Sequence, residues 1–396
     1  MIDTSTAPIK TNPRHLTPDG LAAAIFLAFL STAGLFYVNL GGSFLSAFVD
    51  GLGLSRESAG YITSSNKYGA AFGAFIAVLL VKHMNWRKTA YFVLPTLILT
   101  DVISFQIADE TFLIAIRFFH GSIGGFLVGL GLSVIARMQS PEKGYGMLLA
   151  VQYTFGSVGI FTVPKLVGLF GHAAAFGALI TFSLITLAMV PFIPDYPPRE
   201  KAPARPDGKK SSVMLVPLLL TLAAIFLFQT ANMGVADYAF ELGKDSGYTM
   251  SELSNLLAVA NLISVSGALL VYSVGTRYGR LLPLMVGVGL AATFTLAFHF
   301  SEIPAVYFIA NTVTGMTWAF CMSYFLGLIA AFDGHGQMAA LGGVISKMGL
   351  ASGPLIGAMV VGEGNFTLII NLAAGALVLC ALFALSPALR LDRANT

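Results

Sequence analysis

The sequence predicts an all-α membrane protein with twelve transmembrane helices in two pseudo-symmetric six-helix bundles. Of its 396 residues, 56% are hydrophobic and only 10% are charged, against roughly 25% charged residues in soluble domains. The mean hydropathy is +0.80. Glycine (42 residues) and phenylalanine (31 residues) are both frequent, as in helices that pack closely within lipid. This composition excludes a soluble enzyme, a disordered chain and a disulfide scaffold.

The same composition argues against several partners and chemistries. The net charge of +3 is too small and too scattered for a nucleic-acid partner. Cys321 and Cys380 lie inside apolar runs, where they are expected to act as small packing residues. No Ser/His/Asp order, Gly-rich phosphate loop or metal-spaced His or Cys cluster occurs. We therefore expect no enzymatic activity, no catalytic residue, no cofactor and no metal site.

Twelve apolar runs are long enough to cross a membrane, which takes about 20 residues. They cover residues 20–48, 58–81, 89–107, 111–136, 145–170, 173–193, 213–240, 252–274, 281–300, 303–331, 337–361 and 365–387. Several runs exceed 20 residues, which predicts tilted or kinked helices rather than additional spans. The runs are too long, and alternate too little, for a β-barrel.

The distribution of Lys and Arg predicts that both termini are cytoplasmic. With that orientation sixteen of the twenty-two cations lie inside, whereas the outer loops carry only Arg56 and Lys244. The inner cations are Lys10, Arg14, Lys82, Arg87, Lys88, Arg137, Lys143, Arg199, Lys201, Arg205, Lys209, Lys210, Arg277, Arg280, Arg390 and Arg393. Residues 1–19 contain no apolar segment typical of a cleavable signal peptide. We expect a multi-pass protein of a bacterial inner (plasma) membrane.

A Pro-rich, charged stretch divides the chain into two halves. The expected domains are an N-terminal six-helix bundle (residues 1–193), a cytoplasmic linker (194–212) and a C-terminal six-helix bundle (213–396). A shift of 193 residues aligns four pairs, which are Asn39 with Asn232, Gly41 with Gly234, Arg87 with Arg280, and Gly156 with Gly349. This repetition indicates an internal duplication, the usual construction of transporters that bind substrate between repeats.

Over nearly its whole length the chain resembles the major facilitator superfamily of transporters. The loop from Lys82 to Lys88 resembles the family's Gly-x-x-x-Asp-Arg-x-Gly-Arg-Lys loop, although His83 and Trp86 replace its Asp and Gly. The loop Arg277-Tyr278-Gly279-Arg280 keeps Arg-x-Gly-Arg. In span four, Arg117-Phe118-Phe119-His120-Gly121 is similar to the family's Arg-x-x-Gln-Gly signature.

The resemblance implies alternating access of the rocker-switch type, driven by a proton gradient or by exchange. It also implies that Arg87, Lys88, Arg277 and Arg280 act in cytoplasmic gates. The Gly-x-x-x-Gly-Pro-x-x-Gly pattern that drug/proton antiporters carry in span five is found here in span eleven, at Gly349–Gly357. That displacement argues against drug antiport.

Two lysines are predicted to lie near the membrane centre. Lys67 in span two and Lys347 in span eleven each lie about ten residues from a helix end, a depth of about 15 Å. A lysine stem cannot extend that far to an interface. No carboxylate is placed at this depth, because Asp237 is assigned to the outer end of span seven and Glu241 to water.

An unpaired buried ammonium is costly, so we expect it to bind an anion. The sharper prediction is that the anion is a substrate carboxylate held between Lys67 and Lys347. A lysine in span eleven is also similar to the substrate lysine of oxalate/formate-type exchangers in the superfamily. The alternative leaves Lys67 neutral or paired with Asp101, and Lys347 hydrogen-bonded to helix carbonyls.

Further site residues are polar groups at suitable depth. Asn39 and Asn232 form the repeat-matched pair, and Tyr153 and Trp318 are candidates to contact an aromatic ligand, with a packing role as the competing interpretation for these two. For proton coupling the candidates are Arg117, Asp101 and His120. His120 is also a candidate substrate ligand. An Arg117–Asp101 bridge of purely structural purpose is the alternative to coupling.

The sequence therefore favours a secondary active transporter that moves a small organic anion of carboxylate type, by proton coupling or by exchange. The alternative is a proton-driven multidrug efflux antiporter, and a third hypothesis is a membrane sensor or assembly factor that uses the transporter fold. The expected partners are the anionic substrate, protons and the lipid bilayer, without nucleic acid, and the expected oligomeric state is a monomer.

Overall fold

The protein is a bundle of long helices. The computed structural model describes residues 15–18, 20–139, 141–196, 215–332, 337–362 and 364–394, and within these residues it contains no named β-strand. The first helices are α1 (Leu21–Asn39), α2 (Gly41–Leu52), α3 (Arg56–Leu80), α4 (Trp86–Ser104), α5 (Glu110–Ile135), α6 (Pro141–Phe170) and α7 (Ala173–Met189). The later helices are α8 (Leu215–Ala236), α9 (Ala239–Asp245), α10 (Met250–Ser264), α11 (Ser266–Val274), α12 (Leu281–Ala297), α13 (Pro304–Ala331), α14 (Gln337–Val361) and α15 (Phe366–Ala394).

These helices follow the expected apolar runs. Three runs are interrupted, so that α1 and α2 share the first run, α8 and α9 the seventh, and α10 and α11 the eighth. The first break falls at Leu40, and the second falls at Asp237 and Tyr238. The shift of 193 residues takes Leu40 to position 233, so the break in the C-terminal half falls four to five residues later than the repeat alone places it.

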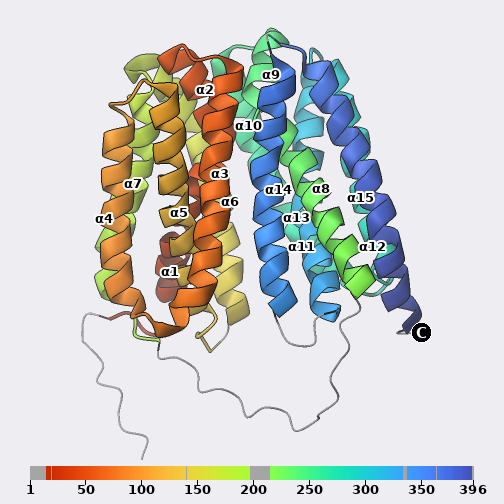
Figure 1. The fold of residues 1–396 in the computed structure, drawn as a ribbon, viewed down its shortest axis with the longest axis horizontal. Coiled ribbons are helices and arrows are strands. Elements are labelled where there is room, and N and C mark those ends of the chain that lie inside the picture. The colour runs from red at the N-terminus through yellow and green to blue at the C-terminus, as the bar shows by residue number, and fades with distance from the viewer. Residues whose placement is uncertain are drawn as a thin grey trace, which may run out of the picture.

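Ten helices of the described residues are long and apolar enough to cross a membrane. Helices α3 and α4 are not among the ten, because Lys67 lies in a polar stretch of α3 and α4 carries Arg87, Lys88 and Asp101. Both run upright beside the other helices (Figure 1). The all-helical membrane fold is confirmed, whereas the count of twelve spans stays a prediction that requires α3 and α4 to cross as well.

The helices form two groups that stand side by side (Figure 1). We call α1–α7 the N-terminal group, on the left of the view, and α8–α15 the C-terminal group, on the right. The face at which α1 begins and α15 ends is the terminal face, and the other is the opposite face. Leu16 is fixed at the terminal face, because its amide donates to the carbonyl of Phe192 at the end of the 3-10 helix Val190–Phe192. Most of the expected linker, 197–212, lies outside the described residues.

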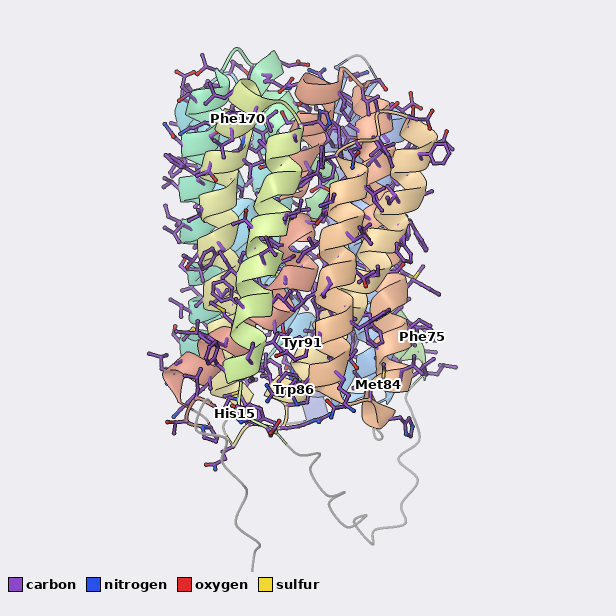
Figure 2. The ribbon with its side chains drawn as sticks, turned by 90° about the vertical axis from the view of Figure 1, so that its left-hand side faces the viewer. His15, Phe75, Met84, Trp86, Tyr91 and Phe170 are labelled. Carbon is purple, nitrogen blue, oxygen red and sulfur yellow. The ribbon has the colours of Figure 1, made fainter. Side chains whose placement is uncertain are left out.

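Large apolar side chains cover the outside of the bundle. Phe75, Tyr91 and Phe170 project from its surface (Figure 2), and Phe170 is 69% exposed. Phe92 and Leu169 are exposed to a similar extent. Such surfaces are unfavourable in water but match the hydrocarbon of a bilayer, so they fit the membrane assignment.

Within the N-terminal group, α3 and α5 touch through their backbones. A Cβ on Gly69 or Gly73 would collide with the α5 backbone, and a Cβ on Gly121 or Gly125 would collide with the α3 backbone. Small residues on both helices allow this approach, as is common in membrane helix pairs. The contact fixes the depth of the polar residues that α3 and α5 carry.

A methyl group at this contact is predicted to destabilise the protein. In Gly125→Ala the new Cβ would meet the carbonyl oxygen of Ala70, so we expect a loss of about 1–3 kcal/mol from overpacking. Gly177→Ala in α7 is the matched control, because its Cβ meets nothing within 4 Å and alanine favours helix by about 0.5–1 kcal/mol. Thermal unfolding in detergent measures both, and equal melting temperatures would contradict the close-contact interpretation.

Candidate functional site

A cavity of about 460 Å³ lies between the two helix groups. It is lined by α1, α2 and α6 from the N-terminal group and by α8, α9, α10, α12, α13 and α14 from the C-terminal group. The lining extends to Leu326 and Gly343, close to the terminal-face ends of α13 and α14. Among the described residues, the acidic and basic side chains of the lining are those of Asp237 and Lys347.

Asp237 is the carboxylate that sequence reasoning did not place in the interior. It lies at the break between α8 and α9, is 4% exposed, and forms an ion pair with the ammonium of Lys67 on α3. Lys67 is itself only 2% exposed and does not line the cavity. The expectation of two central lysines without a central acid is therefore wrong. Asp101, the alternative partner that the sequence suggests for Lys67, pairs instead with Arg117.

Two glycines make room for this ion pair. A Cβ on Gly41 would lie 2.5 Å from Oδ1 of Asp237 and 3.2 Å from Nζ of Lys67. A Cβ on Gly42 would lie 3.2 Å from the carbonyl oxygens of Ala236 and Asp237. Both glycines stand at the start of α2, directly after the break at Leu40. Because they carry no side chain, the start of α2 can approach the break between α8 and α9 closely. The pair therefore joins the two helix groups.

Lys347 on α14 differs from Lys67 in having no partner among the described residues. It lines the cavity and makes no hydrogen bond or ion pair with any of them. Contacts of Gly349 with Gln229 and of Gly353 with Gly234 set α14 and α8 side by side in register. By that register Lys347 lies ten residues, or about 15 Å, closer to the terminal face than Asp237.

A rigid polar group lies beside Lys347. Gln229 donates from Nε2 to Oγ of Ser346 over 2.7 Å and accepts from Nε1 of Trp318 over 2.6 Å. Both ends of its amide are thereby held, and the indole of Trp318 is fixed against the cavity. Trp318 is one of the expected site residues, whereas nothing in the sequence beyond their depth points to Gln229 and Ser346.

Asn39, Asn232 and Tyr153 also line the cavity, as expected. The amide nitrogen Nδ2 of Asn39 is buried without a hydrogen-bond partner among the described residues. That of Asn232 donates to the carbonyl of Phe228 over 2.7 Å. The repeat-matched asparagines therefore face the same cavity from α1 and α8, but they present different groups to it.

Comparison with known proteins identifies the family. The sequence model of the Major Facilitator Superfamily matches residues 21–358. The chain belongs to this superfamily. An uncharacterised MFS-type transporter of Bacillus subtilis, YbcL, is 23% identical over 275 residues, which is 67% of each chain.

Solved structures of other proteins share the superfamily's fold. A mutant of the nucleoside transporter NupG has a TM-score of 0.73 at 14% identity, covering 92% of this chain and 98% of that one. The D-xylose–proton symporter has a TM-score of 0.64 at 16% identity, with coverage of 93% and 95%. The human organic anion transporter MFSD10 has a TM-score of 0.62 at 15% identity, with coverage of 92% and 97%. At these identities the likeness establishes the fold alone.

The superfamily's span-four signature belongs to a buried cluster inside the N-terminal group. Arg117 donates to Asp101 over 2.9 Å and to Oγ of Ser104 over 2.7 Å. Nε2 of His120 lies 3.3 Å from the same carboxylate, and its Nδ1 lies 2.9 Å from Nδ2 of Asn66. The Arg117–Asp101 bridge agrees with the sequence-based expectation. None of these residues lines the cavity, so direct substrate contact by His120 has no support in this conformation.

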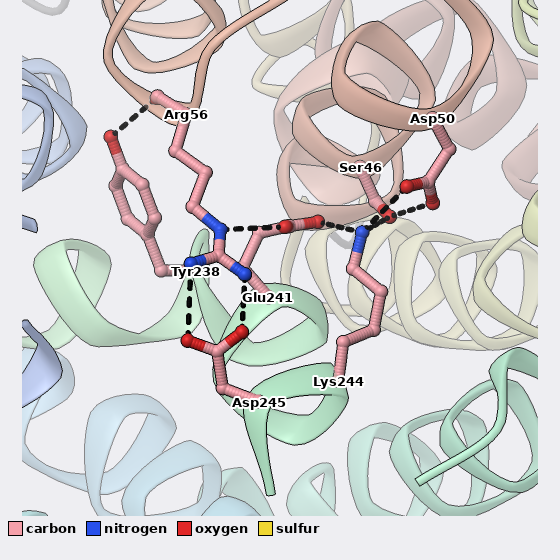
Figure 3. Close-up of polar contacts among 7 residues, drawn as sticks. All are labelled: Ser46, Asp50, Arg56, Tyr238, Glu241, Lys244 and Asp245. Carbon is pink, nitrogen blue, oxygen red and sulfur yellow. Dashed lines mark hydrogen bonds and ion pairs between the residues drawn. The ribbon is translucent and has the colours of Figure 1, made fainter. Parts of the chain in front are cut away.

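A second set of ion pairs joins the helix groups at the opposite face (Figure 3). Arg56 of α3 pairs with Glu241 over 3.0 Å and with Asp245, both on α9. Lys244 pairs with Asp50 of α2 over 2.8 Å and with Glu241 over 2.5 Å. The expectation that Glu241 lies in water is wrong, because its carboxylate is fully buried between the two cations.

The predicted gate residues at the terminal face make contacts within one helix group. Arg87 donates to the carbonyls of Val190 and Ile193 and pairs with Asp195 over 2.9 Å. The amide of Arg280 donates to Asp392 over 2.8 Å, while Lys88 is exposed. Among the described residues, the side chains of Arg87, Lys88, Arg277 and Arg280 make no hydrogen bond or ion pair between the two groups, so their gate role stays a prediction.

Removing the opposite-face cations is predicted to open that face. We expect Arg56→Gln with Lys244→Gln to lengthen the distance between spin labels at Glu57→Cys and Ser251→Cys, because the cross-group ion pairs are lost. Double electron–electron resonance between the two labels measures this distance, in a protein from which the native Cys321 and Cys380 have been removed so that they are not labelled. Lys88→Gln is the control, since that cation is exposed at the terminal face. An unchanged distance distribution would show that the ion pairs do not hold the face closed.

Loss of one partner of the buried Lys67–Asp237 pair is predicted to destabilise the protein. Lys67→Met or Asp237→Leu alone leaves one buried charge unpaired, and we expect each to cost about 3–5 kcal/mol. The double variant removes both charges and is expected to recover most of this loss. Thermal unfolding of the four proteins measures the effect. Additive losses in the double variant would contradict an ion pair between these residues.

Proposed function

We propose that this superfamily member is a secondary active transporter of a small organic anion. One observation carries the proposal. Asp237 is neutralised by Lys67, whereas Lys347 has no partner among the described residues, so the cavity keeps one uncompensated positive charge. A cation that lines an enclosed cavity without a protein partner favours an anionic ligand, since an unpaired charge inside a protein is costly. Lys347 is therefore the proposed substrate ligand, and the two-lysine clamp is replaced by a single-lysine site.

The proposed orientation places the terminal face in the cytoplasm of a bacterial cell. The inner Lys and Arg of the sequence support it, including Arg87, Arg280 and Arg390. Cross-group ion pairs lie toward the opposite face, while the cavity lining continues to Gly343 near the terminal face. The conformation is then closed to the outside, and substrate enters or leaves through the cytoplasmic side.

Two groups are proposed to couple transport to protons or to exchange. Protonation of Asp237 would release Lys67 and weaken the connection between the helix groups. The Asp101–Arg117–His120 cluster lies near this pair. Asn66 of α3 donates to the carbonyl of Arg117 and contacts His120, and the next residue of α3 is Lys67. The arrangement supports proton symport through these groups, and anion exchange remains the alternative mode.

Anions are predicted to stabilise the purified protein through Lys347. A ligand at 100 times its dissociation constant adds about 2.7 kcal/mol, which is visible as a higher melting temperature. The panel contains mono- and dicarboxylates, aromatic acids, phosphates, lipophilic cations and neutral sugars. We expect only anions to stabilise, and Lys347→Gln to abolish the shift. Lys165→Gln is the matched control, because that lysine contacts Asn255 outside the cavity.

Stabilisation by lipophilic cations, or an unchanged anion effect in Lys347→Gln, would refute the proposal and favour drug efflux. Uptake of the stabilising anion into proteoliposomes separates the two coupling modes. Symport predicts accumulation driven by a pH gradient and its loss in Asp237→Asn. Exchange predicts uptake that requires anion inside the vesicles and ignores the gradient.

A further inference from the structure

The asparagines of the cavity are oriented in a common way. Asn232, Asn261 and Asn311 each donate Nδ2 to a backbone carbonyl, of Phe228, Tyr153 and Tyr307 respectively. Among the described residues none of their Oδ1 atoms accepts a hydrogen bond, and all three side chains line the cavity. The C-terminal group therefore supplies three lining asparagines whose side-chain oxygens are available to accept hydrogen bonds from a ligand.

An asparagine of the N-terminal group also lines the cavity. Nδ2 of Asn39 is buried and has no partner among the described residues. Gly156 separates this asparagine from Asn261, since its Cβ position lies 3.7 Å from Cβ of Asn39 and 3.5 Å from Nδ2 of Asn261. The absence of a side chain at Gly156 leaves room between these two asparagines. A hydroxyl group of a ligand can donate to an asparagine oxygen and can itself accept a hydrogen bond.

The acceptors extend away from Lys347 toward the opposite face. Trp318 bonds to Gln229, so Asn311 lies seven residues, about 10 Å, beyond that level, and Asn232 lies three residues, about 4.5 Å, beyond it. Ser264 contacts the carbonyl of Thr312, which places Asn261 at the depth of Asn311. A ligand whose carboxylate binds Lys347 would direct its chain along this series of acceptors.

We infer that the transported anion is a polyhydroxylated carboxylate, such as an aldonate or uronate. This inference rests on the proposed anion transport and specifies its substrate class. Hydroxyl groups on the ligand fit better than a ligand ammonium group. The cavity already holds the ammonium of Lys347, and Asp237 is neutralised by Lys67. An apolar chain would leave the asparagine oxygens without donors, which costs binding free energy.

The test compares gluconate, hexanoate, 6-aminohexanoate and glucose by calorimetric binding to the detergent-purified protein. We expect gluconate to bind at least about tenfold more tightly than hexanoate, the size of one well-made hydrogen bond to a buried group. Glucose is expected not to bind. Asn311→Leu should weaken gluconate about tenfold and leave hexanoate unchanged. The matched control is Asn371→Leu, because Asn371 bonds to His299 outside the cavity.

The comparison of ligands on the wild-type protein needs no variant, so misfolding of Asn311→Leu leaves the test valid. Equal Lys347-dependent binding of hexanoate and gluconate would overturn the hydroxyl inference while the anion proposal stands. Preferential binding of 6-aminohexanoate would also overturn it, since the acceptors would then serve an ammonium group. Absence of binding by every anion would refute the proposed function itself.

Discussion

The ion pair between Lys67 and Asp237 is the interaction on which the rest of the structure depends. It joins the two helix groups where both side chains are almost completely buried. Removing two charges from water is expensive, and only mutual pairing with close geometry offsets that cost. The glycines at 41 and 42 provide this geometry by letting α2 approach the break between α8 and α9. A pair of this kind contributes to specifying one arrangement of the two groups more than to stability.

Apart from the Arg117–Asp101 cluster inside the N-terminal group, the interior charges form three levels along the bundle. Arg56 and Lys244 bind three carboxylates at the opposite face, the Lys67–Asp237 pair follows below, and Lys347 lies about 15 Å nearer the terminal face. Every charge of the first two levels has an oppositely charged partner, and both levels join the helix groups. The third is unsatisfied and lies where the groups enclose the cavity. The positive charge available to a ligand is therefore confined to the part of the cavity nearer the terminal face.

Much of the fold and part of the site are predictable from the sequence. The apolar runs place the helices, because hydrocarbon requires long apolar helices whose backbones are internally bonded. The depth of Lys347 also follows from counting residues along a single helix, whereas the Arg117–Asp101 bridge joins two helices and is only one of the alternatives that the sequence leaves open. Counting misplaces Asp237, because the helical segment continues as α9 to Asp245, beyond residue 240 where the apolar run ends. The burial of Glu241 depends on Arg56 and Lys244, two cations 188 residues apart. Such partners are set by how helices pack, which hydropathy does not encode.

The position of the ion pairs constrains how the protein can change conformation. Opening the opposite face must separate α3 from α8 and α9, so Lys67 and Arg56 lose their partners in the same movement. Two buried charges left unpaired would make that state costly unless a proton neutralises Asp237 or the groups become hydrated. The anion that we propose for Lys347 would change the balance only through its different affinity for the two states. We therefore expect protonation of Asp237 and anion binding at Lys347 to be coupled through the equilibrium between the two conformations. Direct contact between the proton and the substrate is not required.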